Sequence, residues 1–121
     1  MSIVAAVLVA IVALIHVWFL VLEMVLWQKP LGLRTFRLTP QQAASTATLA
    51  ANQGLYNGFL AAGLVVALFL PQPSAFHFKL FFLGCVIVAG LFGAATVSKR
   101  ILLIQALPAA LALAAVLIAG S

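Results

Sequence analysis

Four apolar runs, each about as long as the hydrocarbon core of a bilayer requires, occupy most of this 121-residue chain. A helix needs about 20 mostly apolar residues to cross that core. Hydrophobic residues make up 67% of the chain and charged residues only 6%, whereas soluble domains carry about 25% charged residues. The composition therefore excludes a water-soluble globular domain and predicts an integral membrane protein. We expect membrane-spanning segments over residues 3–27, 40–70, 75–97 and 101–119.

These segments must be helical, because a backbone in contact with lipid has to satisfy its own hydrogen bonds. The predicted fold is an all-α, four-transmembrane-helix bundle in a single domain, residues 1–121. No Lys or Arg precedes the first apolar run, so we expect a retained helix rather than a signal peptide. Thr39, Pro40 and Gln42 are spaced as a capping box at the start of the second helix. Ser74 is the predicted cap of the third helix.

The basic residues predict how the helices are oriented. Five of the six lie in the first and third connections: Lys29, Arg34, Arg37, Lys99 and Arg100. Lys79 lies towards the opposite side. Because cytoplasmic connections carry the excess of Lys and Arg, we expect these two connections inside and both termini on the outer side. The charges form no basic face, so the net charge of +5 does not indicate a nucleic-acid partner.

Polar side chains inside the spans are the candidate functional residues. Glu23 is the only acidic residue of the chain and lies within the first apolar run, where a carboxyl is costly and is a functional candidate by default. Counted from the middle of the first helix, Glu23 lies about 12 Å towards the cytoplasm. Most of the other polar groups fall in the same half of the bilayer. The predicted ligand- or proton-binding residues are Glu23, His16, Asn52, Gln53, Tyr56, Asn57, Thr96 and Gln105.

Two roles for Glu23 follow from this pattern. Its carboxyl either accepts hydrogen bonds that hold helices together, from Asn52, Gln53 or Tyr56, or binds a substrate, cation or proton. Gly54 and Gly58 form a small-xxx-small pair that favours close helix approach.

The sequence predicts neither a metal site nor a cofactor site. His16 and Glu23 lie about 10 Å apart along one helix, which is a poor metal-binding arrangement. No cofactor fingerprint occurs. Cys85 is the sole cysteine, so no intrachain disulfide forms, and we expect a buried, inert thiol.

Several motifs resemble one known family. They are the segment from His16 to Trp27, Asn52-Gln53-Gly54-Leu55-Tyr56-Asn57-Gly58-Phe59, Gly93-Ala-Ala-Thr96, and Gln105-Ala-Leu-Pro108-Ala. This pattern is similar to the DUF1304 family of small, mainly bacterial, four-helix membrane proteins of unknown function. The resemblance covers nearly the whole chain and implies a multi-pass protein of the bacterial inner or plasma membrane. It implies no assigned activity.

Three functions remain open at this stage. The first is binding or transport of a small hydrophobic or cationic molecule, with Glu23 as a protonatable centre. That layout is similar to small multidrug-resistance exporters, although none of their other motifs occurs here. The second is a membrane enzyme acting on a lipophilic substrate, with Glu23 and His16 as acid–base candidates. The third is a structural or assembly subunit. We expect the lipid bilayer as a partner and favour binding or transport, with self-association as a further expectation.

Overall fold

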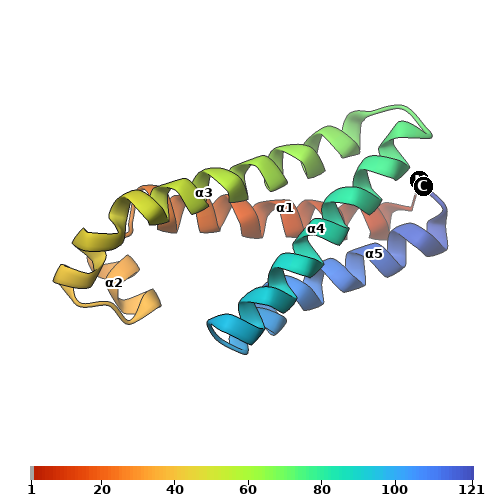
Figure 1. The fold of residues 1–121 in the computed structure, drawn as a ribbon. Helices are drawn as coiled ribbons and strands as arrows, with labels where there is room; N and C mark the ends of the chain where they lie inside the picture. Colours follow the sequence, from red (N-terminus) through yellow and green to blue (C-terminus); the bar gives the residue numbers. More distant parts are fainter. Residues whose placement is uncertain (1) are drawn as a thin grey trace. The chain divides into compact units, whose positions relative to one another are not determined.

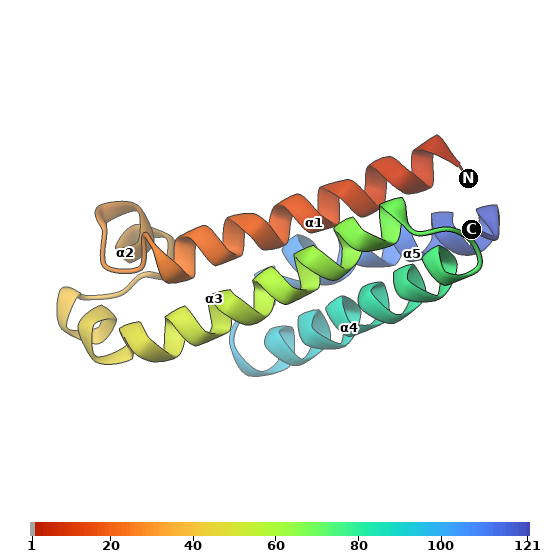
Figure 2. The ribbon, with the colours of Figure 1, turned by 90° about the horizontal axis from the view of Figure 1, so that it is seen from above.

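A computed structural model describes residues 2–121 as helices joined by short connections, with no strand among them (Figures 1 and 2). Four of its helical segments are long and apolar enough to cross a membrane. The helices are α1 (Ile3–Met24), α2 (Pro30–Phe36), α3 (Pro40–Phe69), α4 (Ser74–Thr96), the π-helical η1 (Leu102–Ala106) and α5 (Leu107–Ala119). The all-helical architecture with four apolar spans agrees with the prediction.

The described chain divides into two compact units. One contains residues up to Ile15 together with Leu60–Ser121, and the other is His16–Phe59. The long helices α1 and α3 each contribute residues to both units.

The unit formed by the two ends of the chain has an apolar core. Its buried side chains are Ala5, Val9, Val12, Ala13, Leu64, Leu83, Val86, Ala109, Ala112 and Val116. Helices α4 and α5 lie side by side and antiparallel in both views (Figures 1 and 2). A Cβ atom on Gly90 would lie only 2.8 Å from the Cβ of Ala106. The missing side chain therefore lets α4 and η1 approach closely.

The last span begins with a widened turn. In η1 the backbone N–H of Leu107 donates to the carbonyl of Leu102, which is the spacing of a π-helix. Pro108 follows at the start of α5. A proline ring clashes with the carbonyl four residues earlier in a regular α-helix, and a widened turn relieves such a clash.

The unit His16–Phe59 contains the end of α1, the short helix α2 and the first part of α3. Helix α1 ends at Met24 rather than at the predicted Trp27. Lys29 is extended before Pro30, as residues before proline usually are. Helix α2 then occupies part of the segment that was expected to be a plain connection.

The two predicted caps have different outcomes. At the start of α3, the N–H of Thr39 donates to Gln42 Oε1 over 2.9 Å, and the N–H of Gln42 donates to Thr39 Oγ1 over 3.1 Å. This confirms the capping box. At α4 the prediction that Ser74 caps the helix is wrong, because Ser74 is the first helical residue. The side chain of Gln72 accepts the N–H of Phe76 instead, over 3.1 Å.

Candidate functional site

Helices α1 and α3 approach closely at the two glycines of α3. A Cβ atom on Gly54 would lie 2.6 Å from Met24 Cγ and 3.1 Å from Glu23 Cβ. One on Gly58 would lie 2.7 Å from Leu20 Cδ1. A side chain at Gly54 or Gly58 would therefore displace side chains of α1. These distances confirm the close helix approach predicted from the glycine spacing.

A hydrogen bond between the two helices joins the polar residues at this crossing. Asn57 Nδ2 donates to Glu23 Oε1 over 2.5 Å, and both residues are partly buried. Within residues 2–121 no other hydrogen bond to the Glu23 carboxyl is present. The donor is a neutral amide, which can bond to a carboxylate or to the carbonyl oxygen of a protonated carboxyl. The bond therefore positions Glu23 without fixing its charge.

The hydrogen-bond partner of Glu23 differs from the prediction. It lies about one helical turn further along α3 than the residues that the helical rise places at the depth of Glu23. The prediction paired Glu23 with Asn52, Gln53 or Tyr56, whereas its observed partner is Asn57. Side chains on a helix lean towards its N-terminus. Glu23 on α1 therefore leans towards the level of Asn57. Since α3 runs the opposite way to α1 in both views (Figures 1 and 2), Asn57 leans back towards Glu23.

The three residues predicted to bond Glu23 lie elsewhere on the surface of α3. Asn52, Gln53 and Tyr56 are all exposed. Tyr56 packs its ring near that of Phe59, with 6.1 Å between the ring centroids. No hydrogen bond connects any of the three to Glu23 among the described residues. Asn57 therefore lies at the crossing with α1, whereas Asn52, Gln53 and Tyr56 lie on the exposed surface of α3.

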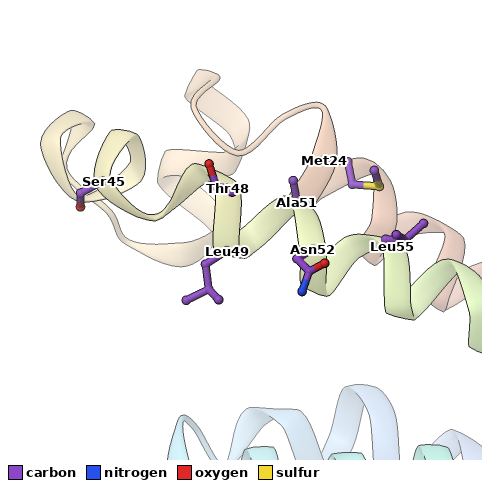
Figure 3. Close-up of a pocket in the computed structure, with 7 residues that line it drawn as sticks. All are labelled: Met24, Ser45, Thr48, Leu49, Ala51, Asn52 and Leu55. Atoms are coloured by element: carbon purple, nitrogen blue, oxygen red, sulfur yellow. The ribbon is translucent and has the colours of Figure 1, made fainter.

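Asn52 belongs to a shallow groove next to the crossing (Figure 3). The groove has a volume of about 610 Å³ and combines polar with apolar side chains. Met24 at the end of α1 lines it, and the other lining residues come from α3: Ser45, Thr48, Leu49, Ala51, Asn52 and Leu55. In Figure 3 the side chains of Leu49 and Asn52 extend away from α1. Met24 directly follows Glu23, so the groove begins one residue from the carboxyl.

His16 is completely buried on α1. It contacts Phe19 edge-on, with 5.3 Å between the ring centroids. His16 and Glu23 are two helical turns apart on the same helix, as the sequence spacing requires. In the described part of the chain, no group of three or more His, Cys, Asp or Glu residues could hold a metal ion.

Thr96 and Gln105 belong to the other compact unit. The Thr96 hydroxyl donates to the carbonyl of Phe92 on its own helix, over 2.7 Å. Gln105 lies within the π-helical turn η1. The geometry described for the Glu23 site therefore involves residues of His16–Phe59 only.

Two features of the structure were missed by the sequence analysis. Thr46 accepts a hydrogen bond from Trp27 Nε1 over 3.2 Å, which ties the segment after α1 to α3. Lys79 is completely buried within α4, in the unit that contains both chain ends. The signal for Lys79 was present, because an ionisable residue inside an apolar run is a functional candidate in its own right.

Comparison with known proteins gives a family and a similar bacterial protein. The family model described as "Protein of unknown function (DUF1304)" matches residues 10–117. The uncharacterized protein YpaA of Lactococcus lactis subsp. lactis (strain IL1403) is 32% identical over 115 residues, covering 93% of this chain and 96% of that protein. No solved structure matches the chain.

Proposed function

The chain belongs to the DUF1304 family, and from the geometry of its second unit we propose that it binds a small amphipathic cation at Glu23. The function is binding or proton-coupled transport across the membrane in which the four spans lie. The observation that carries the proposal is the half-buried carboxyl of Glu23, held by one neutral amide from Asn57.

The chemistry of the pair supports exchange of a proton for a cation. A carboxylate bonded to Lys or Arg is already neutralised, whereas one bonded to Asn keeps its net charge for a ligand. Glu23 is the only acidic side chain in the protein, so no other carboxylate side chain competes for the cation. When the carboxyl takes up a proton, its negative charge is lost and the attraction to a cation falls.

The neighbouring groove supports an amphipathic rather than a purely polar ligand. Leu49, Leu55 and Met24 offer apolar surface, while Asn52, Ser45 and Thr48 offer hydrogen-bonding groups. Small-molecule sites commonly combine a mainly apolar lining with a few placed polar groups.

We propose the orientation in which both termini lie on the outer side of the membrane. The structure strengthens the charge argument, because Lys79 is a buried residue of α4 and not a residue of the outer connection. The other five basic residues all lie between α1 and α3 or between α4 and the last span. The positive-inside rule then places these two connections in the cytoplasm.

The test uses tetraphenylphosphonium, a lipophilic cation, as the probe. Its binding to purified protein in nanodiscs is measured between pH 5 and pH 9 for the wild type, Glu23→Gln and the control Gln53→Ala. We expect wild-type affinity to rise with pH, because deprotonation restores the negative charge. Glu23→Gln keeps the side-chain shape but should bind at least tenfold more weakly at high pH and without pH dependence. Gln53 is exposed, so its variant should behave like the wild type.

A structural role for the same pair is the second candidate, because the Glu23–Asn57 bond joins two helices. Under that function Glu23→Gln lowers the stability of the protein, and no variant changes the binding of the probe. Wild-type binding that is weak and independent of pH would contradict the cation proposal. Thermal unfolding of the same samples measures the structural contribution separately.

A further inference from the structure

The segment between α1 and α3 contains three basic residues next to two aromatic side chains that pack together. Lys29, Arg34 and Arg37 are all exposed. Lys29 immediately precedes α2, Arg34 lies in its last turn, and Arg37 is its C-cap. We refer to residues 27–37, which contain these cations, as the basic segment.

The basic segment is packed against the end of α1 and does not hang freely from it. Gly32 is buried, and any side chain there would overlap the carbonyl oxygen of Leu26. The rings of Trp27 and Phe36 lie with their centroids 4.7 Å apart. Trp27 is held in turn by its hydrogen bond to Thr46 on α3. The backbone that carries the three basic residues therefore keeps a defined position relative to the end of the apolar span.

No carboxylate side chain of the protein neutralises these cations. The only acidic side chain is Glu23, which lies in α1 and is hydrogen-bonded to Asn57. Among the described residues, no ion pair involves Lys29, Arg34 or Arg37. Three uncompensated positive charges beside a tryptophan are complementary to an anionic surface at the boundary of the hydrocarbon core. Tryptophan prefers that boundary, and basic residues near it are attracted to anionic lipids.

We propose that the basic segment is a binding surface for the phosphate-bearing headgroups of anionic phospholipids. Trp27 and Phe36 lie at the level where the acyl chains begin, and Lys29, Arg34 and Arg37 contact the headgroups. Recognition depends on side-chain charge, since α2 has only seven residues. This surface is separate from the Glu23 site, and the proposal requires only that α1 and α3 cross the bilayer.

The test measures which lipids lie next to Trp27. Trp18 is the only other tryptophan, so a Trp18→Phe background makes Trp27 the sole reporter. The protein is reconstituted with brominated phosphatidylglycerol or brominated phosphatidylcholine, and quenching of Trp27 gives the relative affinity for the two lipids. We expect at least a fivefold preference for phosphatidylglycerol, decreasing at 0.5 M salt. Removing basic residues should lower the preference, by up to about fivefold for each charge lost.

The variant pair is Arg34→Gln with Arg37→Asn. Arg37 has a left-handed backbone, with φ 55° and ψ 49°, and asparagine tolerates that conformation. Any loss of lipid preference then reflects charge and not a disrupted cap. The matched control is Lys99→Gln with Arg100→Gln, an exposed basic pair in the other unit. It removes the same charge and should leave Trp27 quenching unchanged.

Three results would overturn the proposal. The first is equal quenching by both lipids in the wild-type background, and the second is an equal loss of preference in the Lys99/Arg100 control. The third is competition by millimolar inorganic phosphate, which would indicate a site for soluble phosphate instead. Far-ultraviolet circular dichroism and the Trp27 emission maximum in phosphatidylcholine alone establish that each variant is folded.

Discussion

The hydrogen bond between Asn57 and Glu23 predicts a measurable coupling between these two residues. Replacing Asn57 with Ala removes the donor, and replacing Glu23 with Ala removes the acceptor. Each single variant also loses packing at the helix crossing. The double-mutant cycle subtracts those packing losses, so that it isolates the interaction between the two side chains.

The expected coupling free energy is in the range from about 0.6 kcal/mol, the average for hydrogen bonds between helices in a membrane protein, to about 1.7 kcal/mol, the largest value found there. The upper part of this range is expected if Glu23 is charged, because charge-assisted hydrogen bonds are roughly twice as strong as neutral ones. Glu23→Gln should lose less stability than Glu23→Ala, since a glutamine carbonyl can still accept the Asn57 amide. Glu23 and Asn57 are only partly buried, so we expect no larger coupling free energy between them.

The assay is reversible unfolding of purified protein in mixed micelles of dodecyl maltoside and sodium dodecyl sulfate, followed by tryptophan fluorescence. A second cycle between Glu23→Ala and Gln53→Ala is the control, because Gln53 is exposed and makes no hydrogen bond to Glu23 among the described residues. Its coupling should be zero within about 0.3–0.5 kcal/mol. A zero coupling between positions 23 and 57, or an equal one between 23 and 53, would refute the proposed pairing.

Two further predictions concern packing and orientation. Gly54→Leu should destabilise the protein by about 1–3 kcal/mol in the same unfolding assay, because even its Cβ presses on Met24 and Glu23. Gly84→Leu has nothing within 4 Å of its Cβ, so its stability should stay near that of the wild type, and equal losses would contradict the crossing. In a Cys85→Ala background, a membrane-impermeant maleimide should label Gln72→Cys in intact spheroplasts and Arg37→Cys only after permeabilisation. The reverse labelling would contradict the proposed orientation.

Features determined by neighbouring residues in the sequence could be predicted before the structure. The apolar runs are long enough to identify the spans, and the spacing of Thr39 and Gln42 is sufficient for the capping box. The Gly54 and Gly58 pair indicated close approach, because the absence of a side chain matters wherever a second helix crosses. None of these inferences requires knowledge of which residue lies opposite.

Features that depend on distant contacts could not be predicted in the same way. The position of helix α2 depends on the fit of Gly32 against the backbone that follows α1, which no local pattern reveals. The replacement of Ser74 by Gln72 as the capping side chain depends on the path of the backbone before α4. The pairing of Glu23 with Asn57 depends on how two side chains lean across a crossing whose register the sequence does not specify.

The two compact units are stabilised by different kinds of contact, and this difference bears on function. The first unit buries a cluster of apolar side chains and also the charged residue Lys79. In the His16–Phe59 unit, α3 is joined to α1 and to the segment after it by close packing at glycines and by the hydrogen bonds of Asn57 and Trp27. Glu23 is the only carboxyl side chain of the protein and lies in the second unit, whereas the ionisable group buried in the first unit is the cation Lys79. A ligand-dependent change should therefore begin at Glu23 and the groove beside it.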